Sequence, residues 1–232
     1  MLLSQFSVAN RLLAALPRDD YQCLSEQLEP VVLLAGDVLC EVGGDIDYVY
    51  FFNEALVSLT VPVDQTEFYS VALVGRDGMA GASVAMGAWK SLVRVTVLCA
   101  GGAFRMRTLL FLKAFNESPQ IRESVLQYLL ALHIQAARTA ACNRFHRIEQ
   151  RLARWLLMSR DRLSTDHFHM THETLGLLLG VRRVGVTNAA HDLKLRCLID
   201  YSRGAIDIIN GAGLRGVACS CYHPLEGRHG VS

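Results

Sequence analysis

The sequence predicts an α+β chain made of an N-terminal antiparallel β-roll of the cupin or jelly-roll kind, a long helix and a C-terminal winged helix-turn-helix. Three observations lead to this prediction. Short strand-like runs separated by glycine turns fill residues 31–106, an unbroken helical stretch begins at Ser118-Pro119, and two short helical patterns meet at Leu179-Gly180-Val181. We expect the roll, the long helix, the winged part and a tail at residues 1–117, 118–146, 147–210 and 211–232.

The charge of the chain is distributed unevenly. Of the 232 residues, 51% are hydrophobic and 19% are charged, which is a globular composition, and the net charge is only +1. Residues 1–146 hold 11 Lys+Arg against 14 Asp+Glu, whereas residues 147–232 hold 12 against 8. Seven of the eight histidines lie at or beyond His146. Such asymmetry is typical of a chain whose more basic half faces nucleic acid.

Neither the first residues nor the cysteines indicate export. The opening segment, MLLSQFSVANRLLAAL, lacks a basic stretch followed by an apolar core and a cleavage site, so we expect an amphipathic helix. No apolar run approaches the ~18 residues that a membrane span needs. The seven cysteines are scattered and odd in number, which fits a reducing compartment better than a disulfide framework. We therefore expect a cytoplasmic protein with no membrane partner.

The first part is predicted to be a helix followed by a β-roll. Leucines recur near helical spacing over residues 10–27. Runs rich in Val, Leu, Tyr and Phe then alternate with pairs such as Gly36-Asp37 and Asn53-Glu54, as in antiparallel sandwiches and barrels. The glycines of VGRDGMAGAS either turn the chain between strands or cradle a phosphate. Because no Walker-type lysine accompanies them, we favour the turns.

The middle of the chain predicts one long helix. Ser118 fits the N-cap and Pro119 the first helical position, and neither Pro nor Gly interrupts residues 120–144. Because its apolar residues cover more than one face, we expect this helix to pack against the roll and against the same helix of a second subunit. An ordinary core helix within one chain is the alternative. The predicted contacts of the dimerisation helix are Val125, Leu129 and Leu132.

The C-terminal part predicts helix, turn, helix and hairpin. The segment RIEQRLARWLLMSRDRL has apolar residues on one face and arginines on the other, and a short strand is expected at residues 168–170. Thr171 can cap the next helix, which ends near Gly180, and a further helix runs from about residue 182 to 193. CLIDYSRGAIDIIN then predicts a two-stranded wing.

The second helix of a winged helix-turn-helix enters the DNA major groove, with its N-terminal residues nearest the bases. An arginine there can form paired hydrogen bonds with O6 and N7 of guanine, worth about 1–3 kcal/mol of discrimination. A solvated helix end is the alternative, but arginine at that position opposes the helix dipole. The predicted base contacts are Arg182, Arg183 and Asn188, and the predicted phosphate contacts are Thr171, His172 and Thr187.

Over about residues 10–210 the chain resembles the Crp/Fnr family of bacterial transcription regulators. The resemblance rests on LLAGDVLCEVGGDIDYVYF in the roll, on the long helix, and on THETLGLLLGVRRVGVTNAAHDLK with its wing. Leu175-Gly176, Gly180 and the Arg183-x-x-Val186 spacing are its most specific features. It implies a homodimer on a two-fold-symmetric operator with half-sites ~34 Å apart, and double-stranded DNA and RNA polymerase as partners.

The resemblance places the family's base contacts on Arg183, Val184 and Asn188. Val184 stands where an acidic residue is usual in the family, and Asn188 stands where arginine is usual. These departures imply an operator different from that of the best-known members.

The resemblance also implies a cyclic-nucleotide-binding-like roll, but the residues that hold the nucleotide differ. Members that bind cAMP use Gly-Glu-Leu and Arg-Ser/Thr, and the matching places here are Gly81-Ala82-Ser83 and Trp89-Lys90-Ser91. Losing both charged anchors argues against cAMP, and the absence of an N-terminal cysteine cluster argues against an iron–sulfur centre. We identify no cofactor and expect the roll to sense another signal or none. The candidate effector pocket comprises Gly81, Ala82, Ser83, Lys90, Ser91 and Arg94.

Other functions have less support. His167, His169 and His172 together with Cys219-x-Cys221 and His223 offer zinc ligands, but none shows the C-x₂₋₄-C spacing of a structural site, so no metal site is predicted. No nucleophile–base motif, H-E-x-x-H or Walker sequence indicates an enzyme. A winged helix that docks a protein partner instead of DNA is the alternative function, and salt-sensitive duplex binding distinguishes the two.

Overall fold

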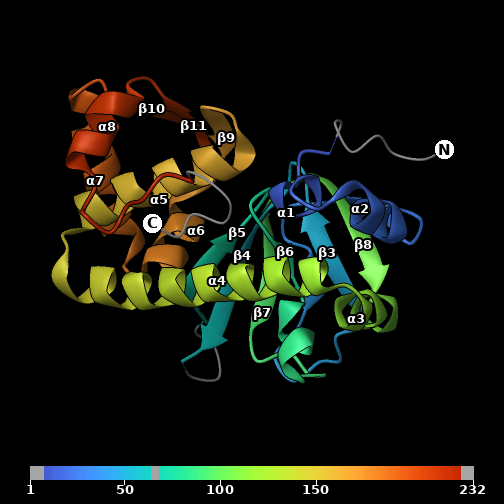
Figure 1. The fold of residues 1–232 in the computed structure, drawn as a ribbon. Coiled ribbons are helices and arrows are strands. Elements are labelled where there is room, and N and C mark those ends of the chain that lie inside the picture. The colour runs from blue at the N-terminus through green and yellow to red at the C-terminus, as the bar shows by residue number, and fades with distance from the viewer. Residues whose placement is uncertain (1–7, 64–67, 226–232) are drawn as a thin grey trace.

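The computed structural model describes residues 8–63 and 68–225 and has the predicted α+β architecture. A β-roll and a C-terminal part lie side by side, and the long helix α4 (Pro119–Phe145) runs along both of them (Figure 1). Within the described residues, no helix combines the length and the apolar character that a membrane crossing requires.

Two short helices precede the roll where the sequence predicts one. α1 (Arg11–Ala14) and α2 (Arg18–Ser25) are separated at Pro17, which is the N-cap of α2. Proline inside a helix lacks the N–H donor and clashes with the preceding turn. The prediction of one helix over residues 10–27 is therefore wrong.

The roll consists of two four-stranded antiparallel sheets, with the orders β1-β8-β3-β6 and β2-β7-β4-β5. Side chains from both sheets, among them Phe52, Val57 and Met106, are buried between them and form the core of the roll. A short 3₁₀ helix, η2 (Ala82–Met86), follows β6. The strands are β1 (Glu29–Leu33), β2 (Val38–Cys40), β3 (Tyr48–Phe52), β4 (Leu56–Pro62), β5 (Phe68–Val74), β6 (Met79–Ala80), β7 (Arg94–Cys99) and β8 (Gly101–Arg107).

α3 (Thr108–Glu117) and the first half of α4 are packed on the roll. α4 begins as predicted, because the Ser118 hydroxyl accepts a hydrogen bond from the N–H three residues on at 3.1 Å and a proline occupies the first helical position. The Tyr128 hydroxyl donates to the Met79 carbonyl at 2.7 Å. A Cβ at Gly78 would lie 2.2 Å from the Tyr128 ring, so this close approach needs glycine.

The residues predicted for the dimer interface lie on the roll side of α4. Val125 is 4% exposed within the roll's core, and Leu129 and Leu132 pack against the same core. The predicted dimer contact through Val125 is wrong, because its own chain already covers this side chain. Leu126 and Leu130, one turn apart, are 47% and 52% exposed and mark the outward face of the helix.

The C-terminal part is a four-helix unit with a small sheet, and its core contains residues of all four helices. The wing is three-stranded, not two-stranded, because β9 pairs with β11 to give the order β10-β11-β9. Its tight turn uses Arg203 and Gly204, both with positive φ, as the sequence predicts. The elements are α5 (Ile148–Leu163), β9 (His167–His169), α6 (His172–Leu179), α7 (Arg183–Leu195), β10 (Ile199–Ser202), β11 (Ala205–Ile208) and α8 (Gly211–Val217).

Three of the arginines on α5 are buried, although the sequence places them on the face opposite its apolar residues. Arg151, Arg154 and Arg162 are all at most 7% exposed. The guanidinium of Arg162 pairs with Asp77 of the roll at 2.8 Å. That of Arg151 donates to the Leu179 carbonyl at the end of α6. α5 is covered on both sides because it lies between the roll and the other helices of its own part.

Candidate nucleic-acid interface

α6 and α7 are joined by a tight turn that fixes their relative position. Thr171 caps α6, since its hydroxyl oxygen accepts a hydrogen bond from the Thr174 N–H at 3.1 Å. α6 ends at Gly180, whose φ of 59° is the left-handed conformation that favours glycine. A Cβ at Gly176 would lie 2.9 Å from the Val181 carbonyl oxygen, so glycine lets α7 return close to α6. This is the helix-turn-helix that the sequence predicts.

α7 has one buried and one exposed face. Its buried face packs in the core of the C-terminal part through Val186, Ala189, Ala190 and Leu193, all at most 5% exposed. The residues of this segment that are predicted to contact DNA are all exposed: Arg182, Arg183, Val184, Thr187 and Asn188. Because the buried face holds the helix from behind, the exposed face is a rigid convex surface suited to a groove.

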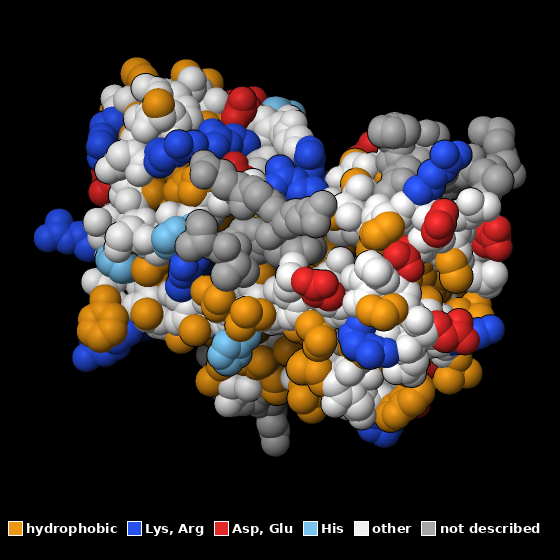
Figure 2. Space-filling model, viewed as in Figure 1, with side chains coloured by type: hydrophobic (Ala, Val, Ile, Leu, Met, Phe, Trp, Pro, Cys, Tyr) orange, Lys and Arg blue, Asp and Glu red, His pale blue; other side chains and the backbone are white. Residues whose placement is uncertain are grey.

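The two arginines at the start of α7 carry charge that the described part of the chain leaves unneutralised. Neither Arg182 nor Arg183 forms an ion pair with a carboxylate of the described residues. Lys194 at the other end of the helix pairs with Asp200 of the wing at 2.5 Å. Figure 2 shows Lys and Arg side chains gathered over the C-terminal part, whereas acidic and basic side chains mix over the roll. The first turn of α7 therefore offers an anionic ligand two cations free of acidic partners.

His172 lies inside the junction of α6, α7 and the wing. Its ring stacks on Tyr201, with centroids 3.9 Å apart and planes at 14°, and its Nδ1 lies 3.1 Å from the Thr187 hydroxyl. Its Nε2 is buried without a hydrogen-bond partner among the described residues. Burial, followed by the nearby charge of Arg183, lowers the pKa of the ring below its ordinary value. The predicted phosphate contact does not fit this placement, because Nε2 is buried and Nδ1 is engaged with the Thr187 hydroxyl.

The other two predicted phosphate contacts are exposed threonines. The Thr171 hydroxyl lies 2.9 Å from that of Thr174, and the Thr187 hydroxyl donates to the Arg183 carbonyl at 3.1 Å. A phosphate oxygen accepts hydrogen bonds, so each threonine would contact it through its single O–H, and Thr187 would first have to release the Arg183 carbonyl. Their contact with phosphate stays a prediction.

The predicted effector residues are only partly brought together. A cavity of about 430 Å³ lies in the roll, and Leu129 and Leu132 of α4 form part of its wall. Most of the cavity's wall is apolar, so it suits a ligand with a large apolar surface. The predicted residues that line it are Gly81, Ala82, Ser83 and Ser91.

The two predicted cations of the effector pocket lie outside this cavity. Lys90 pairs with Asp45 at 3.1 Å, and Arg94 pairs with Glu41 at 3.1 Å. The charged side chains among the described wall residues are Asp45 and Asp47. Because acidic groups line the cavity and cations do not, the cavity disfavours a ligand phosphate.

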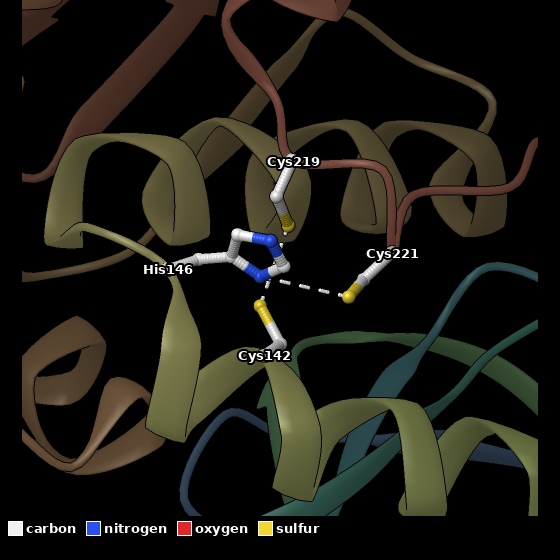
Figure 3. A group of neighbouring side chains, drawn as sticks. All are labelled: Cys142, His146, Cys219 and Cys221. Carbon is white, nitrogen blue, oxygen red and sulfur yellow. Dashed lines mark hydrogen bonds between the residues drawn. The ribbon is translucent and has the colours of Figure 1, made fainter.

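The sequence points to only half of a second group of reactive side chains. Cys219 and Cys221 lie beside Cys142 and His146, and one ligand atom from each of the four lies within 4.8 Å of all the others (Figure 3). The histidines that the sequence offers as partners, at positions 167, 169, 172 and 223, are not in this group. The sequence signals that could have indicated this group are the C-x₃-H spacing of Cys142 and His146 and the C-x-C spacing of Cys219 and Cys221. Because Cys142 and Cys219 are 77 positions apart, neither spacing shows that the two pairs meet.

Comparison with known proteins agrees with this geometry. Residues 150–217 match the family model of the Crp-like helix-turn-helix domain. No curated protein matches the sequence. Among solved structures, FixK2 from Bradyrhizobium japonicum is 13% identical with a TM-score of 0.72, and the match covers 83% of this chain and 98% of that chain.

Two further structures show the same likeness. A transcriptional regulator of the CRP/FNR family from Thermus thermophilus is 22% identical with a TM-score of 0.65, covering 82% of this chain and 98% of that chain. The c-di-GMP responsive global regulator CLP from Xanthomonas campestris is 12% identical with a TM-score of 0.66, covering 83% of this chain and 99% of that chain. Residues 150–217 thus form a Crp-like helix-turn-helix domain, and the chain has the fold of the Crp/Fnr family of transcription regulators.

Proposed function

We propose that this protein is a sequence-specific DNA-binding transcription regulator, not an enzyme, and that α7 is its recognition helix. One observation carries the proposal: the exposed face of α7 begins with Arg182 and Arg183, and neither has an acidic partner among the described residues. Three arginines of α5 in the same domain are buried and hydrogen-bonded within the fold, whereas this exposed pair at the start of α7 is free to meet a ligand.

Different exposed residues of α7 contact different parts of the DNA. Arg182 and Arg183 lie at the end of the helix that enters the groove first, where a guanidinium reaches O6 and N7 of guanine. Asn188 lies further along the exposed face and suits an adenine edge, while Val184, 68% exposed, offers an apolar contact to a thymine methyl group. Thr171 and Thr187 contact phosphate. His172 has a structural role, since it packs between α6, α7 and the wing.

The regulator acts as a homodimer through the outward face of α4. Leu126 and Leu130 lie one turn apart on this face and are about half exposed, and hydrophobic side chains show along the helix in Figure 2. Two such stripes bury each other when two copies of α4 pack together. A two-fold-symmetric dimer then reads half-sites ~34 Å apart. Its other partner is RNA polymerase.

The roll senses a signal other than cAMP, or none. Its cavity lacks a cation among the described wall residues and is lined by Asp45 and Asp47, which disfavours a cyclic phosphate. Because Leu129 and Leu132 belong both to the cavity wall and to α4, a ligand in the cavity contacts the dimerisation helix directly. An apolar ligand could change the position of α4 in this way.

The first test is duplex binding as a function of salt. Phosphate neutralisation predicts that log Kd rises linearly with log salt, and that an Arg183→Ala variant keeps most of this slope while it loses preference among sequences. A helix that docks a protein partner predicts no salt-sensitive duplex binding at all.

The dimer is tested separately by sedimentation of a Leu126→Asp/Leu130→Asp variant, which should be a folded monomer. An unchanged dimer would exclude this face of α4 as the interface.

A further inference from the structure

The end of α4 and the segment after α8 bring four soft or borderline donor groups together. Cys142 and His146 are four positions apart, so they lie on one face of the helix end, and His146 is the C-cap of α4. Cys219 and Cys221 lie in a turn closed by a hydrogen bond from the Tyr222 N–H to the Cys219 carbonyl at 3.0 Å. In Figure 3 the four side chains point toward a common centre from these two segments.

The separations of the donor atoms are close to those around a tetrahedral metal ion. The Sγ atoms of Cys142 and Cys219 are 3.4 Å apart, and Nδ1 of His146 lies 3.6 Å from Sγ of Cys221. With Zn–S bonds of about 2.3 Å and Zn–N bonds of about 2.0–2.1 Å, a tetrahedron has edges of about 3.8 Å between sulfurs and about 3.6 Å between sulfur and nitrogen. All the other pairs lie within 4.8 Å, so side-chain shifts of about 1 Å or less complete the site.

The cysteine-bearing turn is held in place by groups other than its thiols. Tyr222 is 8% exposed, and its hydroxyl donates to the Asp161 carboxylate of α5 at 2.8 Å. Nε of Arg154, also on α5, donates to the Cys221 carbonyl at 3.3 Å. The donor atoms are therefore preorganised, which is what a tight metal site needs. Cys142 and Cys219 are buried while His146 and Cys221 are half-buried, so an ion can enter from the side of the latter two.

Arg154 supplies the charge that such a centre requires. A divalent ion with three thiolates and one neutral imidazole has a net charge of about −1. Arg154 is 5% exposed and has no carboxylate partner among the described residues. Its guanidinium donates to the Thr139 hydroxyl at 3.2 Å and, through Nε, to the carbonyl of one of the four cluster residues. A buried cation without a carboxylate is otherwise costly, and an anionic metal centre beside it offsets that cost.

We propose that Cys142, His146, Cys219 and Cys221 form a metal site for a thiolate-preferring divalent cation, namely Zn²⁺. Three sulfur ligands and one nitrogen ligand exclude Mg²⁺ and Ca²⁺, which take oxygen ligands. Four protein ligands close a tetrahedron, as in structural zinc sites, and leave no open position for catalysis. The ion joins the segment after α8 to the junction between α4 and α5, and so fixes the C-terminal part on the long helix. This inference stands independently of DNA binding.

The test is a titration of the full-length, reduced and chelator-treated protein with Co²⁺ under nitrogen. Tetrahedral Co²⁺ with thiolate ligands gives visible d–d bands and a thiolate charge-transfer band in the near ultraviolet. We expect one Co²⁺ per chain, displacement by one equivalent of Zn²⁺, and a rise in Tm when Zn²⁺ is added.

Three variants assign the ligands. Cys221→Ser should lose about a third of the charge-transfer intensity, as three thiolates become two, and should weaken Co²⁺ binding by more than about 100-fold. His146→Ala should keep the charge-transfer intensity per bound ion but bind comparably weakly. Cys23→Ser, at an exposed cysteine of α2, should match the unaltered protein and is the control.

Two results would overturn the proposal. One is the absence of a thiolate charge-transfer band in the unaltered protein, which decides the question even if a variant fails to fold. The other is a disulfide between Cys142 and Cys219 that persists, by mass spectrometry, in protein purified and kept under reducing conditions. Circular dichroism of each variant before titration separates loss of a ligand from loss of the fold.

Discussion

α5 and α7 are neighbouring helices of one domain, yet they use arginine in opposite ways. On α5, Arg151, Arg154 and Arg162 are buried, and each guanidinium is hydrogen-bonded to named groups of the chain. On α7, Arg182 and Arg183 are exposed and lack a carboxylate partner among the described residues. The first set is explained by contacts within the fold, whereas the second is the set that we propose contacts DNA.

This difference separates stability from recognition. A buried arginine that loses its partner leaves an uncompensated charge in the protein interior, so changes around α5 should lower the free energy of unfolding. An exposed arginine contributes little to folding, so changes at the start of α7 should alter DNA selection and leave stability nearly unchanged. Each of the following predictions tests one side of this comparison.

The largest effect is expected at the ion pair between α5 and the roll. Asp77→Ala leaves the Arg162 guanidinium, whose side chain is 5% exposed, without its carboxylate at 2.8 Å. We expect the free energy of unfolding in urea to fall by about 3–5 kcal/mol. Because the Arg162 guanidinium contacts Asp77, Leu73 and Met158 and not α7, the sequence preference of the remaining folded protein should be unchanged. A loss below about 1 kcal/mol would mean that the pair is solvated in solution.

The next largest effect concerns recognition. Arg183→Ala should reduce the preference for a specific duplex over a random one by about 1–3 kcal/mol, or about 5- to 150-fold in relative Kd. The matched control is Arg196→Ala at the other end of α7, where the guanidinium pairs with Glu149 at 2.7 Å. The control should keep the preference. Equal weakening of specific and random duplexes by Arg183→Ala would show that this arginine contacts phosphate instead of a base.

A smaller effect comes from His172, whose pKa is lowered by burial and then by Arg183. The unfolded chain binds a proton near the ordinary pKa of about 6.5, and the folded chain binds it only at lower pH. The stabilisation from the neutral ring is therefore complete above about pH 6.5 and is lost as the pH falls toward the folded pKa. Urea midpoints at pH 7.5 and 5.5 should differ more in the unaltered protein than in His172→Gln. An equal difference in both proteins would assign the pH effect to other groups.

The smallest effect is expected at the roll surface. Lys90 and Asp45 form an exposed pair at 3.1 Å, with side chains 66% and 71% exposed. Lys90→Ala should change the free energy of unfolding by about 0–1 kcal/mol and should leave DNA selection unchanged, and we expect no cAMP binding with or without this lysine. Calorimetric detection of cAMP binding that Lys90→Ala abolishes would show that this lysine does serve an effector site.

Local sequence signals were sufficient for the helix-turn-helix. The cap at Thr171, the left-handed Gly180 and the exposed arginines of α7 all lie within one short segment, so their spacing predicts their structure. The start of α4 at Ser118 is predictable for the same reason. Pro17 is also a local signal, and the continuous helix predicted across it is wrong because leucine spacing was weighed above proline.

Features that depend on distant segments could not be predicted in this way. Helical periodicity places Arg162 on a polar face, but it does not show that Asp77 of the roll will cover that face. The same limit applies to Val125, whose cover is its own roll and not a second subunit. It applies most strongly to Cys142 and Cys219, which meet across 77 positions of sequence. The local spacing of residues carries no information about which distant segments meet.

The most direct test of the central claim, that the unpaired arginines of α7 read DNA, is selection from a random duplex pool. The purified protein, without added ligand, is mixed with the pool, and the bound fragments are sequenced beside those bound by Arg183→Ala. We predict an enriched two-fold-symmetric site with half-sites ~34 Å apart, which loses its guanine preference in the variant. An identical enriched site for both proteins would contradict the assignment of Arg183. No enrichment by the unaltered protein, with or without extracts that supply a signal, would contradict the claim that α7 reads DNA.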